Sequence, residues 1–359
     1  MNPSRLIAAL AVCLLTAPVA HAAEGTAAAP LLKPEGSVDV FYGLNLNRPS
    51  DGTSFFAGIG TTARRANELS LNLASFGVSV SPEPLGMRLL LGYGPAMEVV
   101  HAGEPTGAAI GPEVWRAVQQ ASVLYVANQL TVEAGIYPCH AGFEYLQSQT
   151  NWTYTRSLLS EFAPYYQTGV RVGYRFSDAW SAQVHVLNGW QIIGDNNRAK
   201  TLGTQLAWTG ERVTVAWNTL VGPENPGDDT HWRIFNDVVA TFQVTPAFSL
   251  VAVGDVGFQQ RPDAEPARWY GGALYGRYQL SQPLAVTVRA EVFHDPDATI
   301  SGTAQTLAEG TVSVEWKPID HLVLKLEARH DRSTTAVFSS SDVPVPDQTL
   351  VVAGAVAYF

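Results

Sequence analysis

The stretch YYQTGVRVGYRFSDAWSAQVHVLNGW (165–190) decides the fold that we expect. Every second side chain in it is apolar or aromatic, and polar side chains such as Arg171 and Arg175 stand between them. Consecutive side chains of a strand point to opposite faces, so this period of two predicts strands with one apolar and one polar face. The polar pair at 177–178 leaves no room for a helix, and we therefore expect two antiparallel strands joined by a tight turn.

The same unit recurs from about residue 36 to the last residue. The pattern predicts about sixteen strands, with 12 to 18 as alternatives, and bacterial barrels have an even number. The expected strands are 36–47, 67–80, 85–96, 116–127, 130–138, 165–176, 179–190, 200–209, 212–221, 231–244, 247–259, 268–280, 284–295, 305–317, 320–331 and 348–359.

The connections between these strands alternate in length. The short ones are 82–84, 128–129, 177–178, 210–211, 245–246, 281–283 and 318–319. The long ones are 48–66, 97–115, 139–164, 191–199, 222–230, 260–267, 296–304 and 332–347. Transmembrane barrels have short periplasmic turns and long extracellular loops, whereas a soluble β-sandwich has no reason to sort its loops. We expect one closed antiparallel barrel over 36–359, because lipid leaves no partner for an unpaired strand edge.

Aromatic residues gather on the apolar face beside the short turns, as in the interfacial girdle of a membrane barrel. They are Tyr174, Phe176, Trp180, Trp208, Phe242, Phe248, Tyr278 and Trp316. A soluble periplasmic β-sandwich with aromatic residues at the end of its core is the alternative. The chain ends at Phe359, and a final phenylalanine on a terminal strand resembles the signal that the outer-membrane barrel assembly machinery reads.

The N-terminus predicts export. Residues 1–22 combine Arg5, an apolar run and a small-x-small end, which is the pattern of a signal peptide. Residues 23–35 are rich in Ala and Pro and are expected to be a flexible periplasmic leader. After cleavage Cys139 is the one cysteine, so no intramolecular disulfide is possible. A net charge of −10 without a basic cluster argues against nucleic acid as a partner.

The runs NWTYTRSLL (151–159), QTGVRVGYRFSDAWSAQVHVLNGW (167–190) and DNNRAKTLGTQLAW (195–208) together carry a family resemblance. They resemble the β-barrel porin-2 (OmpL-like) family of outer-membrane barrels, most closely between 128 and 210. The segment 136–149 departs from the family, because Cys139 and His140 stand where a turn with Gly and Pro is usual. The resemblance implies a porin-like role in the outer membrane of a Gram-negative bacterium, without naming a substrate.

A barrel of this size is wide enough to hold water, and we expect the polar faces to line an aqueous lumen. The hypothesis is that loop 139–164 folds inward and narrows a pore, with Arg156 and Glu161 facing Arg171 and Arg175. An external lid is the alternative. The lumen and constriction residues that we expect are Arg156, Glu161, Arg171, Arg175, Arg88, Arg289, Glu291, Lys325, Glu327 and Arg329.

The expected function is a porin for passive diffusion of small hydrophilic solutes or ions. The alternative is a non-conducting structural or adhesion barrel. We expect no catalytic residues, because the neighbours His294–Asp295 and His330–Asp331 point to opposite faces of their strands. No cofactor or metal site is expected, since Cys139 and His140 lack a second pair at ligand spacing. The expected partners are outer-membrane lipid, the assembly machinery, the solutes and further copies in a homotrimer.

Overall fold

The computed structural model describes residues 32–54, 60–105 and 115–359. The predicted signal peptide 1–22 lies outside the described residues, and so does the predicted leader up to residue 31. The first strand begins at Lys33, three residues before the expected boundary. It does so because Lys33 and Pro34 already pair with Ser79 and Val78 of the next strand.

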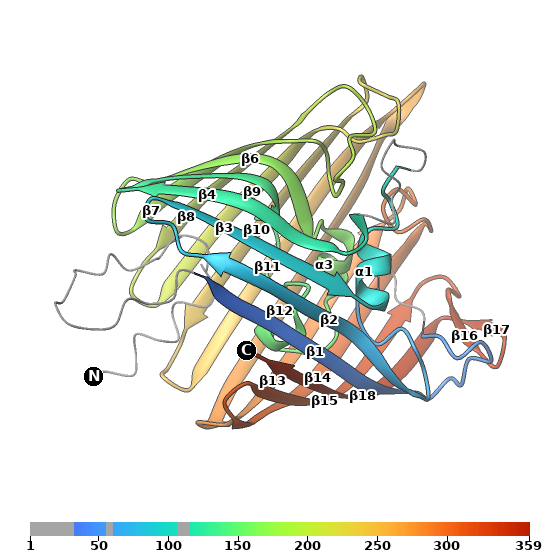
Figure 1. Cartoon of the computed structure of the whole chain (residues 1–359). Helices are drawn as coiled ribbons and strands as arrows, with labels where there is room; N and C mark the ends of the chain where they lie inside the picture. The colour runs from blue at the N-terminus through green and yellow to red at the C-terminus, as the bar shows by residue number, and fades with distance from the viewer. Residues whose placement is uncertain (1–31, 55–59, 106–114) are drawn as a thin grey trace.

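Sixteen of the described strands form one closed antiparallel barrel, as the sequence predicts (Figure 1). Each strand pairs with its neighbour in the chain, and β18 closes the ring by pairing with both β15 and β1. The barrel strands are β1 Lys33–Asn45, β2 Leu69–Val80, β3 Leu85–Tyr93, β4 Val118–Ala127, β5 Leu130–Pro138, β6 Tyr166–Arg175, β7 Trp180–Leu187, β8 Thr201–Thr209, β9 Val213–Pro223, β10 Trp232–Gln243, β11 Phe248–Arg261, β12 Ala264–Ser281, β13 Leu284–Asp295, β14 Gln305–Ile319, β15 Leu322–Ser333 and β18 Asp347–Tyr358.

The ring closes at the two ends of the chain. Ser37 lies opposite Tyr358, and Asn45 lies opposite Leu350. Beyond the last register pair, Gly36 and Phe359 exchange two backbone hydrogen bonds of 3.1 and 3.0 Å. The backbone groups of the first and last strands are thereby paired within the protein, which the interior of a bilayer requires.

The connections differ from the expectation in three places. Strands β11 and β12 stay paired up to Arg261 and Ala264, so the predicted long loop 260–267 is wrong and a tight hairpin takes its place. The predicted loop 332–347 contains a small hairpin of β16 Phe338–Ser340 and β17 Val343–Val345. The predicted strand 85–96 ends at Tyr93, because helix α1, Pro95–Val100, begins with a proline that cannot donate to a ladder.

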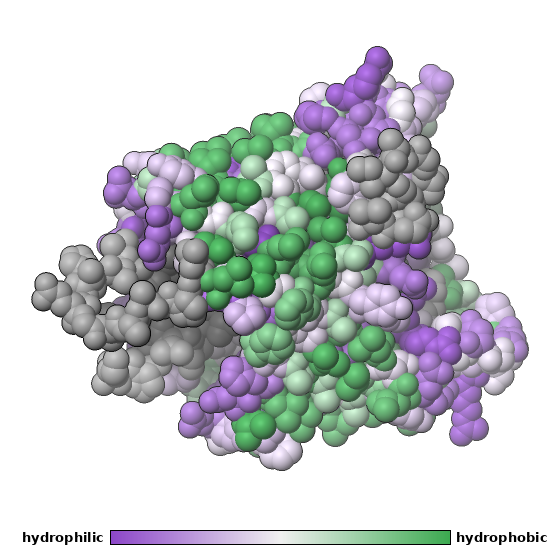
Figure 2. Space-filling model, in the orientation of Figure 1, coloured by the Kyte–Doolittle hydropathy of each residue, from purple (hydrophilic) through white to green (hydrophobic). Residues whose placement is uncertain are grey.

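The outer wall of the barrel is apolar. On the face that Figure 2 shows, hydrophobic residues cover most of the middle of the barrel and hydrophilic residues gather towards its ends. The eight aromatic residues expected beside the short turns are exposed or half-buried on this wall. A continuous exposed apolar band is what acyl chains contact in an outer-membrane barrel. Among the described helices, none has the length and hydropathy that a membrane-spanning helix needs.

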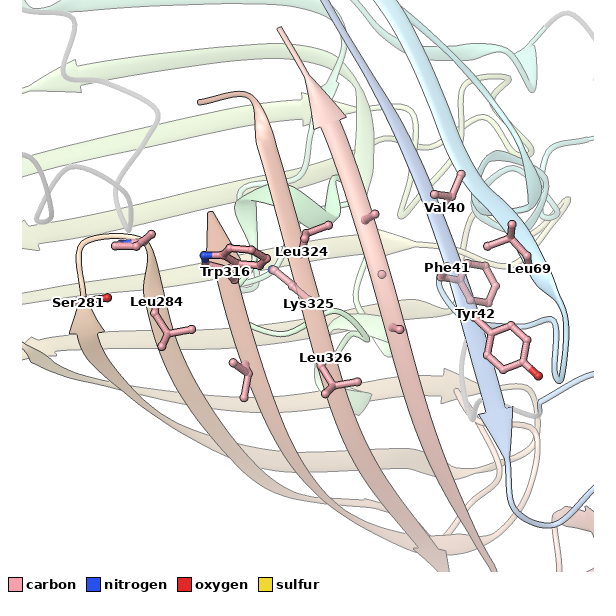
Figure 3. A pocket seen from close by; sticks show the side chains of 15 residues that line it. Val40, Phe41, Tyr42, Leu69, Ser281, Leu284, Trp316, Leu324, Lys325 and Leu326 are labelled. Atoms are coloured by element: carbon pink, nitrogen blue, oxygen red, sulfur yellow. The ribbon is translucent and has the colours of Figure 1, made fainter. Parts of the chain in front are cut away.

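The outer wall is hollowed over β18 (Figure 3). Ala353 and Ala355 face outward there and leave a depression of about 810 Å³ between larger side chains of the neighbouring strands. Trp316, Leu324 and Tyr42 stand around it (Figure 3). The wall therefore carries a large apolar hollow next to the seam where the barrel closes.

Candidate functional site: a loop anchored inside the barrel

The loop between β5 and β6, residues 139–165, lies inside the barrel. Figure 1 shows its helix α3, Leu158–Phe162, within the ring of strands. A short 3-10 turn, Ser148–Thr150, precedes a run that is almost completely buried from 153 to 163. The helix begins where the Ser157 side chain accepts a hydrogen bond from the Ser160 backbone N–H, a common N-cap. The loop therefore lies on the inner side of the wall.

Acidic residues of the wall bind backbone N–H groups of this loop. Glu327 on β15 accepts hydrogen bonds from Tyr154 N at 2.6 Å and Thr155 N at 3.0 Å, and also from the Thr155 hydroxyl. Glu291 on β13 accepts from Leu158 N at 2.8 Å, at the first turn of α3. These hydrogen bonds hold the loop backbone against β13 and β15, where no regular pairing is available.

Asp39 on β1 extends this contact to the other side of the seam. Its carboxylate accepts from the Ser148 hydroxyl at 2.6 Å and from the Tyr154 hydroxyl at 2.8 Å. A Cβ at Gly354 of β18 would lie 2.3 Å from the Tyr154 ring. Only glycine leaves room for this ring, so the loop and the wall are fitted to each other.

Basic residues of the wall bind the carbonyl groups of the same loop. Lys325 donates to Ser148 O at 2.9 Å and Thr153 O at 3.2 Å, and also to Asn151 O. Arg289 donates to Thr155 O and Thr153 Oγ1, both at 2.8 Å. Arg329 donates to Arg156 O at 2.5 Å. Acids and bases on adjacent strands thus satisfy both kinds of backbone group in an irregular segment.

One acid of this network belongs to the loop itself. Glu144 forms an ion pair with Arg289 at 3.1 Å and accepts a hydrogen bond from Ser157 N at 2.6 Å. Burial opposes ionisation of Glu144, but Arg289 and the Ser157 N–H together keep the pKa of this carboxyl below its usual value. Glu144 is therefore an anion at neutral pH. It connects its own part of the loop to Arg289 on the wall and to Ser157 at the start of α3.

Apolar side chains of α3 pack on an apolar part of the inner wall. Leu158, Leu159 and Phe162 join one buried cluster with residues from β5 to β14. Phe162 stacks on Phe293 with a ring separation of 4.2 Å. Phe235 on β10 belongs to the same cluster. The helix is therefore held by desolvated apolar contacts as well as by charges.

Two predicted constriction residues occupy unexpected places. The guanidinium group of Arg156 donates to the carbonyl oxygens of Tyr145, Leu146 and Tyr154. Its N–H donors are therefore occupied within the loop, because three carbonyl groups converge on the guanidinium group. Glu161 accepts from Gly60 N at 2.8 Å and Thr61 N at 3.0 Å.

The structure thus does not bring Arg156 and Glu161 to Arg171 and Arg175, and that predicted arrangement is wrong. Arg171 forms an ion pair with Glu133 on the wall. Arg175 is half-buried near the short-turn end of β6. Glu161 instead connects the loop 139–165 to Gly60 and Thr61, which belong to the connection between β1 and β2.

The expected wet lumen needs a correction at the level of this loop. Arg289, Glu291, Lys325, Glu327 and Arg329 do face inward as predicted, but all are buried. They meet the loop rather than water, because the loop brings polar backbone groups that need partners. Arg88, the remaining predicted residue, is half-buried and pairs with Glu35 at 2.6 Å.

Four anchors of the loop were not among the expected constriction residues: Asp39 and Asp237 on the wall, and Glu144 and Tyr154 in the loop. Asp237 accepts from Gly142 N at 3.0 Å, near the start of the loop. One available signal was the row of charged residues at the inward positions of β13, β14 and β15.

The histidine–aspartate neighbours are divided between the two faces of their strands. Asp295 is buried and accepts hydrogen bonds from Ile300 N and Ser301 N, whereas His294 contacts Thr306 and the Tyr270 ring. Within the described ranges, no group of three or more His, Cys, Asp or Glu side chains is arranged to hold a metal ion.

Comparisons with solved structures relate this barrel to outer-membrane porins. The anion-selective porin from Comamonas acidovorans matches with a TM-score of 0.60 at 9% identity, over 91% of this chain and 99% of that one. The outer-membrane channel DcaP of Acinetobacter baumannii matches with 0.58 at 12% identity, over 91% and 97%. A trimeric form of OmpT from Vibrio cholerae matches with 0.57 at 10% identity, over 91% and 99%. These likenesses show the fold.

The sequence comparison is more specific. No curated protein matches the chain. The family model described as "Putative beta-barrel porin-2, OmpL-like" matches residues 32–359, which is the whole barrel from its first strand to its last residue. Family and fold together favour a channel over an enzyme and place the protein in the outer membrane of a Gram-negative bacterium. The chain belongs to the β-barrel porin-2, OmpL-like, family of outer-membrane porins.

Proposed function

We propose that the protein is a porin for passive diffusion of small hydrophilic solutes or ions, with its pore narrowed by loop 139–164. The observation that carries the proposal is the anchoring of this loop inside a closed sixteen-stranded barrel. A loop held by Glu327, Lys325 and Arg289 stays at one height of the lumen, so it sets the radius that solutes must pass. Selection is then by size and by the charges left accessible beside the loop.

Removal of residues 148–160 tests the proposal. This deletion takes away the segment that Lys325 and Glu327 bind, and it leaves the sixteen strands intact. In planar bilayers the deletion variant should show a larger single-channel conductance than the parent, and liposomes should admit larger sugars. A heat-dependent shift in gel mobility checks that the variant is folded. Unchanged conductance in a folded variant contradicts the constriction.

The second candidate function is a non-conducting structural or adhesion barrel. The feature that favours it is the reach of the loop, which contacts β1, β10, β13 and β15 in the described part of the chain. A loop attached on several sides of a lumen can close it. If the parent protein gives no conductance and the deletion variant conducts, the anchored loop is a plug and the barrel is closed in its resting state.

A homotrimer is the oligomeric state that we propose, with support from the trimeric form of OmpT among the structural neighbours. The hollow over Ala353 and Ala355 would receive apolar side chains of a second copy. An Ala355→Trp substitution fills this hollow and should reduce the trimer fraction in detergent, measured by analytical ultracentrifugation. Ala240→Trp on β10 is the matched control. Equal trimer fractions in all three proteins count against this interface.

The barrel assembly machinery is the remaining partner that we propose, through Phe359. Its exposed side chain and its position at the end of the closing strand support this role. Deletion of Phe359 should lower the yield of folded barrel in the outer membrane, whereas refolding of the purified chain into detergent should change little. A similar loss in both assays would instead mean that the residue only helps to close the ring.

A further inference from the structure

A second cluster of functional groups lies above the anchored loop, at the end of the barrel that carries the long loops. Arg233, the second residue of β10, faces inward between two tryptophan rings. Its guanidinium carbon lies 5.1 Å from the centre of the Trp190 ring and 5.8 Å from that of Trp269. Planar guanidinium groups stack favourably on indole faces, so the rings fix the plane of the cation.

A buried glutamine fixes the inner edge of the same cation. Arg233 Nε donates to Gln259 Oε1 at 2.8 Å, and Gln259 lies opposite Arg233 on the neighbouring strand. The amide of Gln259 is held in turn by His231 O at 3.3 Å and Gln260 O at 3.0 Å. Trp190 is also positioned, since its backbone N–H donates to Glu224 at 2.6 Å. The guanidinium group is therefore preorganised by fixed neighbours.

The outer edge of this cation is unused. Within the described residues, neither Nη group of Arg233 has a hydrogen-bond partner, and no carboxylate forms an ion pair with it. The Arg233 side chain is half-buried, so it is not sealed inside the wall, whereas Trp269 Nε1 is buried without an acceptor in the described part of the chain. Two free Nη groups of a planar fork are the geometry that binds a carboxylate through two hydrogen bonds.

We propose that Arg233, with Trp190, Trp269 and Gln259, forms a binding site for small organic carboxylates at the outer mouth of the barrel. The tryptophan rings and Gln259 hold the cation in place, so little side-chain freedom is lost when a carboxylate binds. Trp190 is half-buried and offers an apolar surface beside the charge. Glu224 is occupied by Trp190 N and the Thr201 hydroxyl, although its charge weakens the attraction for anions. A role of this site in solute uptake rests on the proposed channel function, but the binding of carboxylates does not.

Tryptophan fluorescence of the folded protein in detergent tests the site. Sodium butyrate is added at fixed ionic strength, and neutral butyramide serves as the isosteric control ligand. Butyrate should change the emission, and the change should saturate with an apparent Kd of about 1 mM. Butyramide should give no saturable change. Absence of saturation by butyrate overturns the proposal.

Substitutions locate the binding to Arg233. Arg233→Gln should raise the apparent Kd for butyrate at least tenfold, roughly 1.4 kcal/mol. Arg198→Gln is the control, because Arg198 lies in an external loop with a side chain that is 94% exposed. Arg233→Lys keeps the charge but loses the fork, and should weaken binding several-fold, which keeps the test valid if the glutamine variant does not fold. Equal binding by wild type and either Arg233 variant, or an equal loss with Arg198→Gln, contradicts the site.

Inorganic phosphate separates the ligand classes. If phosphate saturates the signal in an Arg233-dependent way and butyrate does not, the carboxylate assignment is wrong. Bilayer recordings separate this proposal from the channel proposal. Butyrate binding without conductance supports the carboxylate site and contradicts the channel proposal. Conductance without Arg233-dependent binding supports the channel proposal and contradicts the carboxylate site.

Discussion

The hydrogen bonds from Glu327 to the loop predict a strong effect of one isosteric substitution. In Glu327→Gln the side chain keeps its shape but loses its charge and one of its two acceptor oxygens. The carboxylate now receives three hydrogen bonds, from Tyr154 N, Thr155 N and Thr155 Oγ1. The glutamine oxygen can keep at most the two from Thr155, and its NH2 group then opposes the N–H of Tyr154.

The size of the effect follows from these three contacts. Hydrogen bonds to a charged group contribute about 1.5 to 3 kcal/mol, and neutral ones about 0.5 to 1.5 kcal/mol. One charged hydrogen bond is lost and two become neutral, so docking of the loop should weaken by at least about 3 kcal/mol. No discount for solvent screening is needed, because Glu327 is only 1% exposed. An undocked loop should therefore be populated more than a hundredfold more often.

Trypsin cleavage after Arg156 measures this opening. Arg156 is completely buried in the docked loop, so cleavage of its peptide bond needs an open form. Mass spectrometry of the folded protein should show cleavage at this bond at least about a hundredfold faster in Glu327→Gln, when opening and closing are fast compared with cleavage. Glu133→Gln is the control: Glu133 is equally buried and ion-paired with Arg171, but it does not touch the loop. An unchanged rate in Glu327→Gln, or equal acceleration in both variants, refutes the reasoning.

Three further outcomes are expected. Because the pKa of Glu144 is lowered in the folded protein, its stabilisation is complete above its usual pKa of 4.5 and is lost as the pH falls through the folded value. Current fluctuations should therefore grow as the pH falls below 4.5, and Glu144→Gln should abolish that dependence. Gly354→Ala places a Cβ against a loop tyrosine and should destabilise the fold by about 1 to 3 kcal/mol, seen as a lower temperature of heat modification, whereas Gly310→Ala, with open space around it, should not. Oxygen dissolved in the lipid should speed the spin relaxation of a nitroxide label at Leu274, which is exposed on the outer wall, and should have little effect on a label at the inward Ala273.

The fold could be predicted because its cause is local. Alternation along each strand fixes which side chains face lipid, and the requirement to pair every backbone group then forces closure. The prediction of a long loop at 260–267 was wrong, because strand pairing can continue beyond the membrane without any change in the alternation of side chains. It does so at Arg261 and Ala264. A strand pattern therefore predicts pairing better than it predicts where the membrane ends.

The site could be predicted only in part. The inward position of Arg289, Lys325 and Glu327 follows from strand alternation, but their partners lie in a loop without periodicity. Arg156 illustrates the difficulty, because its guanidinium group binds three carbonyl oxygens of its own loop. No spacing in the sequence indicates that these carbonyl groups converge. For the same reason, the sequence does not predict that Arg233 lies between two tryptophans from different segments.

The inward-facing cations differ in how much of their hydrogen-bonding capacity is already used. A guanidinium group has five N–H donors. On Arg289 all three nitrogens donate to wall or loop oxygens, whereas on Arg233 only Nε has a partner in the described structure. A solute that reaches the middle of the barrel must compete with covalently tethered acceptors, and at the mouth it meets a cation with free donors. In the proposed channel, charge selection should therefore occur at the Arg233 site, and the loop should act mainly through size.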